Sequence, residues 1–167
     1  MPGRAHWQAA YVGVGSNLDG PRERVAAACQ ALSTLAQTRV LFVSRSYRSE
    51  PVGYADQPAF VNAVVAVLTL LAAPALHAAL RALERDLGKT APAVRYGPRL
   101  IDLDLLAYGE TVIDTPELTV PHPRLHERAF VLYPLCELAP ALWIPGRGRV
   151  AALRDAVDGT GVCPLNS

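Results

Sequence analysis

The chain has 167 residues, of which 51% are apolar and 19% are charged, the size and composition of a globular domain with its own core. We expect a single domain over residues 1–167, with loose ends at about 1–8 and 159–167. The formal net charge of +1 gives no general attraction to nucleic acid or to an anionic membrane. Phosphate binding would therefore need a local group of arginines.

Other composition features point to a soluble cytoplasmic protein. The longest apolar stretch, residues 63–73, is too short to span a membrane. The chain start lacks the charged, apolar and small-residue regions of a secretion signal. The three cysteines lie far apart and fit no zinc or redox spacing, which favours a reducing compartment.

The residue patterns predict six main elements. Runs of apolar and β-branched residues indicate strands, and apolar residues at spacings of three and four indicate helices. Pro21 and Pro74 stand near the two helix starts, and Gly88 follows the second helix. The predicted order is strand, helix, strand, strand, helix, strand, over residues 9–15, 19–35, 40–48, 60–70, 74–88 and 100–106.

This order is that of a ferredoxin-like α+β fold, with a βαββαβ core and an antiparallel sheet. The two helices should cover one face of the sheet and leave the other face for a ligand. A tight turn at 108–110 predicts that residues 111–115 pair back as a hairpin. C-terminal helices are predicted around residues 127–135 and 150–157.

The stretch 95–106 carries the most informative chemistry. From residue 100 the side chains alternate, so Asp102 and Asp104 share one face of a strand, with Cα atoms roughly 6.5–7 Å apart. Two such carboxylates repel each other unless a cation lies between them, and Mg²⁺ is commonly held by one or two carboxylates together with substrate phosphates. Arg95 and Arg99 supply guanidinium groups that bind phosphate oxygens. The stretch therefore predicts a magnesium-nucleotide site.

An isolated Asp-x-Asp is more often the solvated face of a half-buried strand, with nearby arginines as ordinary surface charge. The complete string Arg-Tyr-Gly-Pro-Arg-Leu-Ile-Asp-Leu-Asp at 95–104 favours the site. It resembles the signature of the 6-hydroxymethyl-7,8-dihydropterin pyrophosphokinase family, in which an aromatic-Gly-Pro-Arg sequence precedes a hydrophobic Asp-x-Asp strand.

Other blocks in the right order extend this resemblance over roughly residues 10–145. Gly-Ser-Asn-Leu at 15–18 matches the end of the family's first strand, where we expect a structural turn, since it lacks the features of a nucleotide-binding glycine loop. Pro-Val-Gly at 51–53 and Asp-Gln-Pro at 56–58 match a second block. Thr-Val-Pro-His at 119–122 and His-Glu-Arg-Ala-Phe at 126–130 match a third.

Phe60 and Asn62 fall on one face of a predicted strand. An aromatic plate beside an amide suits a flat heterocycle such as a pterin, because the amide both donates and accepts hydrogen bonds. Taken alone, these residues fit equally well as core and sheet edge. The resemblance implies that they bind the pterin together with four others: Ser49, Pro51, Val52 and Phe130.

The resemblance also implies a reaction and a set of roles. The terminal two phosphates of ATP would pass as one unit to the hydroxymethyl group of 6-hydroxymethyl-7,8-dihydropterin, releasing AMP. Asp102 and Asp104 would hold two Mg²⁺ ions, and Arg99, supported by Lys89 and Arg95, would neutralise phosphate charge. The ATP-binding residues implied are Glu84, Tyr96, Arg99, Leu105, Thr119, His122 and Arg128.

The sequence departs from the family pattern at two places, of which the loop at Lys89 and Ala91 leaves an alternative open. Lys89 and Ala91 stand where the family usually has arginines, and lysine keeps the charge but not the planar fork. Tyr96 stands where Trp is frequent. The alternative is a catalytically weak family member that binds pterin or nucleotide.

The expected partners are ATP and the pterin, with no nucleic acid and no membrane. An RNA-binding module of similar fold would display aromatics on a basic strand, which this sequence lacks. The oligomeric state stays open, and a monomer is the form we expect.

Overall fold

The structure is a computed structural model that describes residues 4–51, 53, 55–90 and 96–166. These residues build a six-stranded antiparallel sheet in the order β10-β3-β4-β1-β5, with β2 pairing β4 on the same side as β3. The strands are β1 (Gln8–Ser16), β2 (Thr38–Val43), β3 (Tyr47–Ser49), β4 (Phe60–Thr69), β5 (Asp102–Tyr108) and β10 (Val162–Pro164).

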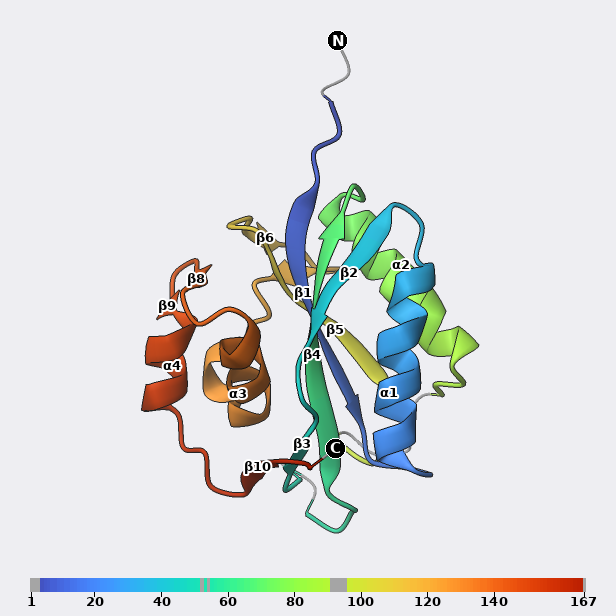
Figure 1. Ribbon diagram of the computed structural model, residues 1–167, viewed down its shortest axis with the longest axis vertical. Coiled ribbons are helices and arrows are strands. Elements are labelled where there is room, and N and C mark those ends of the chain that lie inside the picture. Colours follow the sequence, from blue (N-terminus) through green and yellow to red (C-terminus); the bar gives the residue numbers. More distant parts are fainter. Residues whose placement is uncertain (1–3, 52, 54, 91–95, 167) are drawn as a thin grey trace.

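The helices cover the sheet from both sides (Figure 1). On one side lie α1 (Pro21–Ala31) and α2 (Ala73–Asp86), and on the other lie α3 (Ala129–Leu138) and α4 (Val150–Ala156). The remaining elements are the short helices η1 (Leu32–Thr34) and η2 (Leu125–Glu127) and the paired strands β6 (Ile113–Asp114) with β7 (Thr119–Val120) and β8 (Trp143–Ile144) with β9 (Gly148–Arg149).

The sheet order confirms the ferredoxin-like α+β prediction. The four strands of the predicted core lie in the order β5-β1-β4-β2, and the two predicted helices pack on the same face. No helix in the described part of the chain is long and apolar enough to cross a membrane.

The central strand β4 is buried on both faces. Val65 packs into the cluster formed with α1 and α2, whereas its neighbour Val64 packs into the cluster formed with α3. Successive side chains of a strand point to opposite faces, so a strand covered on both sides needs apolar residues at nearly every position. This explains the continuous apolar run that predicted a central strand.

The predicted strand 40–48 is two strands in the structure. The break lies at Ser44, whose backbone N–H donates to the Val64 carbonyl (2.9 Å), while its hydroxyl accepts the Val64 N–H (2.9 Å). Because a side-chain oxygen takes the place of the next backbone acceptor, the ladder is interrupted. β3 then resumes pairing with β4 at Tyr47.

The predicted hairpin named the wrong pairing strand for residues 111–115. Residues 111–115 do not pair back with the preceding strand; instead, Ile113 and Asp114 in β6 pair with β7. The turn that decides this is closed by Thr115 and Leu118, whose backbone N–H groups donate to each other's carbonyls (3.0 and 3.3 Å).

β1 begins at Gln8, at the limit of the predicted loose start at about 1–8. The predicted loose end at about 159–167 needs correction. There, Val162–Pro164 pairs antiparallel with β3, and the Leu165 N–H donates to the Ser46 carbonyl (2.8 Å). Part of the C-terminal segment is therefore an edge strand of the sheet.

A carboxylate on α3 fastens this helix to the break between β2 and β3. Glu137 Oε2 accepts the Arg45 backbone N–H (2.7 Å), and Oε1 accepts from Arg45 Nε (2.6 Å) and the Tyr47 hydroxyl (3.0 Å). Burial alone would raise the pKa of Glu137, but the hydrogen bonds from Arg45 and Tyr47 outweigh it and lower the pKa.

We expect Glu137→Gln to lower the midpoint of thermal unfolding by a few degrees at neutral pH, because the amide loses the charge-assisted contacts. A carboxyl with a lowered folded-state pKa stabilises above its unfolded pKa and loses this effect as the pH falls through the folded value. The difference from wild type should therefore shrink in acid. Glu117→Gln, at an exposed position, is the control. A pH-independent difference would contradict the ionic contribution.

Candidate active site

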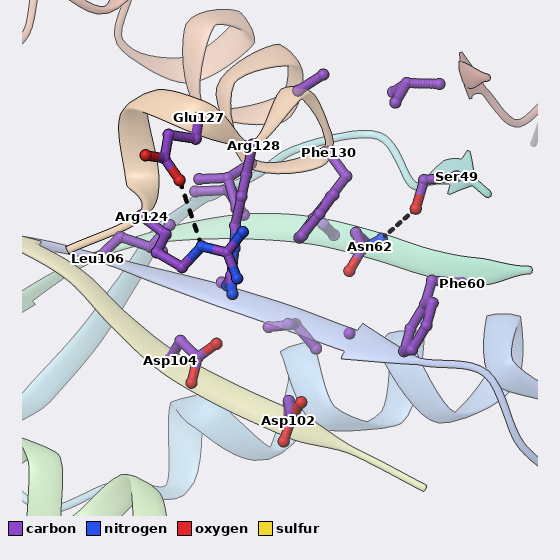
Figure 2. A pocket seen from close by; sticks show the side chains of 18 of the residues that line it. Ser49, Phe60, Asn62, Asp102, Asp104, Leu106, Arg124, Glu127, Arg128 and Phe130 are labelled. Atoms are coloured by element: carbon purple, nitrogen blue, oxygen red, sulfur yellow. Dashed lines mark hydrogen bonds and ion pairs between the residues drawn. The ribbon is translucent and has the colours of Figure 1, made fainter. Parts of the chain in front are cut away.

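A cavity of about 260 Å³ lies between the sheet and the segment around the start of α3. Its floor is formed by β1, β4 and β5, and its roof by residues 124–131 (Figure 2). The cavity lies on the face opposite α1 and α2, as predicted. It brings together residues from the stretches 95–104 and 124–131 and from the strands β1 and β4, which are far apart along the chain.

One end of the cavity combines aromatic rings with a buried amide. Phe60 and Asn62 both line it, which confirms that they share a strand face, and Phe130 reaches toward Asn62 from α3 (Figure 2). Asn62 Nδ2 donates to Ser49 Oγ (3.0 Å), so the amide is held in orientation. A Cβ at Gly15 would lie 2.6 Å from Asn62 Oδ1, so this glycine makes room for the amide.

At the other end, Asp102 and Asp104 project from β5 on the cavity face, as predicted (Figure 2). Asp102 accepts from Lys89 Nζ (2.6 Å) and Arg99 Nη1 (2.8 Å). Burial alone would raise the pKa of Asp102, but Lys89 and Arg99 outweigh it and lower the pKa. The carboxylate is therefore ionised at neutral pH.

The acidic pair fits a cation held jointly with a substrate. Among the described residues, no group of three or more His, Cys, Asp or Glu side chains could hold a metal. The side chain of Asp104 is 36% exposed, and its ion-pair partner Arg81 lies 3.7 Å away. One or two carboxylates completed by phosphate oxygens and water is the usual arrangement for Mg²⁺.

Glu84 stands behind this pair rather than in the cavity. It is 2% exposed, its carboxylate accepts hydrogen bonds from the Leu103 N–H (2.8 Å) and Lys89 Nζ (2.8 Å), and it forms an ion pair with Arg81 Nη2 (2.9 Å). The predicted contact between Glu84 and ATP stays a prediction, since Glu84 does not line the cavity and its carboxylate is already bonded within the protein. Its position suits it to hold β5 and Lys89 in place.

Lys89 bridges Glu84 and Asp102. Burial alone would lower the pKa of Lys89, but the hydrogen bonds and charges of these two carboxylates outweigh it and raise the pKa. The ammonium group is therefore charged and lies beside the acidic pair. The family resemblance predicts that Lys89 helps Arg99 to neutralise phosphate charge, and this position beside Asp102 suits that role.

Two arginines line the roof at this end of the cavity. Arg128 was predicted, and its guanidinium lies 5.5 Å from the Phe130 ring centroid. Burial lowers the pKa of Arg128, although a guanidinium remains charged at neutral pH. Arg124 was missed, although it follows the matched Thr-Val-Pro-His block by two positions. It pairs with Glu127 (3.3 Å), which also lines the cavity.

His122 lies close to this roof without lining the cavity. Its backbone N–H donates to the Leu106 carbonyl (2.9 Å), and its Nδ1 accepts the Arg124 N–H (3.1 Å). Burial lowers the pKa of His122, with Arg128 and Arg124 acting in the same direction and Asp104 opposing them. The imidazole is therefore neutral at physiological pH.

The remaining predicted residues are placed as follows. The side chain of Leu105 is 4% exposed and packs with the core on the α1 and α2 side, whereas Leu106 lines the cavity; a contact of Leu105 with ATP stays a prediction and would have to come from its backbone. Tyr96 lines the cavity, whereas Thr119 and Pro51 do not. Val52 and Arg95 lie outside the described residues.

The turn after β1 is structural, as expected. Asn17 is 1% exposed, and its side chain accepts the Arg99 N–H (2.8 Å) and donates to Gln57 Oε1 (2.8 Å) and the Pro58 carbonyl (3.0 Å). It thereby joins the loop before β4 to the backbone of Arg99. Asn17 itself does not line the cavity, so it supports the site by holding these segments together.

The comparisons with known proteins agree with this geometry. Residues 11–140 match the family described as 7,8-dihydro-6-hydroxymethylpterin-pyrophosphokinase (HPPK). The chain belongs to this family. It is 50% identical over 138 residues to the 2-amino-4-hydroxy-6-hydroxymethyldihydropteridine pyrophosphokinase of Pseudomonas aeruginosa, covering 83% of this chain and 85% of the relative. The Haemophilus influenzae protein of the same name is 41% identical over 136 residues, covering 81% and 84%.

Solved structures share the fold at low sequence identity. Wild-type Plasmodium falciparum HPPK-DHPS superposes with a TM-score of 0.70 at 12% identity. The match covers 92% of this chain and 42% of that larger chain. Together with the relatives, the family match makes this chain a pyrophosphokinase of folate biosynthesis that acts on 6-hydroxymethyl-7,8-dihydropterin.

We expect Glu84→Gln to lower the free energy of unfolding by about 3 kcal/mol, because it breaks a buried ionic network while leaving Lys89 with Asp102. Chemical denaturation at neutral pH measures this effect. Asp86→Asn, on the exposed side of α2, is the matched control. Equal stability of Glu84→Gln and wild type would show that Glu84 does not hold β5.

Proposed function

We propose that the enzyme transfers the terminal diphosphate of ATP to the hydroxymethyl oxygen of the pterin in a Mg²⁺-dependent reaction that releases AMP. The observation that carries this proposal is one cavity with two different ends. Phe60, Asn62 and Phe130 suit a pterin, and Asp102 with Arg99 suits a metal-bound triphosphate. We further propose that it acts in the cytoplasm.

The protein's contribution is positioning and charge neutralisation. The pterin ring would lie between Phe60 and Phe130, with its amide edge on Asn62, which directs the hydroxymethyl group toward Asp102 and Asp104. Phosphoryl transfer needs little covalent help, so an aligned hydroxyl and a stabilised phosphate provide most of the acceleration. The hydroxyl oxygen bonds to the β-phosphorus and gives up its proton to solvent, while the bond between the β-phosphorus and the bridging oxygen breaks, so that AMP leaves with that oxygen.

The cationic side chains would neutralise the phosphates from several directions. Arg99 and Lys89 lie beside Asp102 on the floor, and Arg124 and Arg128 lie on the roof. Asp102 and Asp104 would hold Mg²⁺, which when bound neutralises charge on the phosphate oxygens. Lys89 and Arg99 leave Asp102 ionised, the form that a metal requires.

Product analysis tests the proposal directly. With ATP, Mg²⁺ and the reduced hydroxymethylpterin, wild type should produce AMP and pterin diphosphate in equal amounts. An Asp102→Asn, Asp104→Asn double variant should lose at least about a hundredfold in rate, since removing electrostatic stabilisation of a phosphoryl group typically costs 10²-fold or more. Asp114→Asn, outside the cavity, is the control.

Two outcomes would count against this account. Full activity in the double variant would contradict the metal site. Binding of ATP and pterin by wild type without any AMP would favour the alternative, a family member that binds its ligands without efficient turnover.

Lys89→Arg tests the departure from the family pattern. We expect the turnover number to rise by up to about tenfold, because a guanidinium fork offers one more charge-assisted hydrogen bond to phosphate, and 1.4 kcal/mol corresponds to a factor of ten. Steady-state kinetics with saturating ATP and pterin measure it. An unchanged or lower turnover number would show that lysine serves equally well here.

A further inference from the structure

The C-terminal segment contributes to the cavity from outside the family match. Asp158, Thr160 and Val162 line the same cavity as Phe60 and Asn62, although the matched region ends at residue 140. The roles implied by the family resemblance assign no function to these residues. Their place in the cavity wall is a property of this chain that the shared motifs do not explain.

Strand pairing places this segment at the pterin end. Val162 in β10 lies opposite Ser49 in β3, and Ser49 lies opposite Phe60 in β4. These three residues are therefore neighbours across adjacent strands. Ser49 in turn accepts the hydrogen bond that orients the Asn62 amide. Asp102 and Asp104 lie on β5, at the opposite edge of the sheet from β10, and face the same cavity.

The turn before β10 is closely fitted to its surroundings. Asp158 Oδ1 accepts from the Thr160 N–H (2.9 Å) and the Thr160 hydroxyl (2.6 Å), which closes the turn. A Cβ at Gly159 would lie 2.7 Å from Tyr133 Cζ on α3, so a larger residue would have to displace the turn or the tyrosine ring. Gly161 has a φ of +80°, and a Cβ there would lie 3.1 Å from Glu50 Cγ.

The segment is also anchored beyond the turn. The Leu165 N–H donates to the Ser46 carbonyl (2.8 Å), and the side chain of Arg22 on α1 donates to the Asn166 carbonyl. Contacts on both sides therefore hold residues 158–162 in place beside the cavity. A wall fixed in this way can exclude water and contact a ligand without first being ordered.

We propose that the turn at residues 158–162 forms the outer wall of the pterin end and sets the affinity for the pterin, but not for ATP. This inference rests on the proposed function of the cavity. It assigns substrate affinity to a part of the chain that lies outside the segment matched by the family, so relatives with different C-terminal segments should differ in pterin affinity.

Gly159→Ala tests the proposal, because the added methyl group meets Tyr133 and must displace the turn or the tyrosine ring beside it. We expect the Kd for the reduced hydroxymethylpterin to rise about five- to tenfold, the loss of roughly one good contact. The Kd for ATP with Mg²⁺ should stay within about twofold of wild type, since β5 is untouched. Gly146→Ala is the matched control, because nothing lies within 4 Å of its Cβ position. Isothermal titration calorimetry measures both constants.

Val162→Ala keeps the backbone pairing of β10 and removes apolar surface from the wall, so it decides the matter if Gly159→Ala does not fold. A rise of about threefold or more in pterin Kd is expected. Unchanged pterin affinity in the folded variants would overturn the proposal that residues 158–162 contact the pterin. Failure of wild type to bind pterin would instead overturn the proposed function, so the two failures are distinguishable.

Discussion

The arrangement of the site depends on one buried carboxylate. Glu84 receives a backbone N–H from β5, the ammonium group of Lys89 and the guanidinium of Arg81, all within 2.9 Å. A buried charge is tolerated only when it is paired and hydrogen-bonded, so these contacts are mutually required. Through Leu103, the residue between Asp102 and Asp104, Glu84 fixes the strand that carries both cavity carboxylates. Through Lys89 it places a cation beside them.

The cavity has a floor formed by the sheet and a roof formed by three separate segments of the chain. The floor is a sheet whose strands are locked by helices on the opposite face. The roof comes from the segment before α3, from α3 itself and from the C-terminal turn. Glu137 and Tyr133 on α3 contact the break between β2 and β3 and the turn at Gly159, respectively. The same helix thus connects both edges of the pterin end.

Local patterns were sufficient for the parts of the fold that depend on burial. Alternation predicted that Asp102 and Asp104 share a face, and the apolar run at 60–70 predicted a central strand, because both follow from the side-chain directions of a strand. The resemblance supplied the roles of Phe130 and Arg128, which no local pattern indicates.

Other features depended on contacts that local sequence does not encode. The break at Ser44 requires a hydroxyl to accept a particular N–H on β4. The pairing of β6 with β7 depends on the turn closed by Thr115 and Leu118. The family resemblance implies that Leu105 and Glu84 bind ATP, but neither side chain lines the cavity. Leu105 faces the core, and Glu84 lies behind β5. The wall at 158–162 pairs with a strand far earlier in the chain, so nothing in its own residues predicts it.

The most direct test of this account is a crystal structure of the enzyme with Mg²⁺, a non-hydrolysable ATP analogue and the pterin. The account predicts cations in contact with Asp102 and Asp104 and the pterin ring between Phe60 and Phe130, with its edge on Asn62. A triphosphate bound away from β5, or cations bound without these two carboxylates, would contradict it.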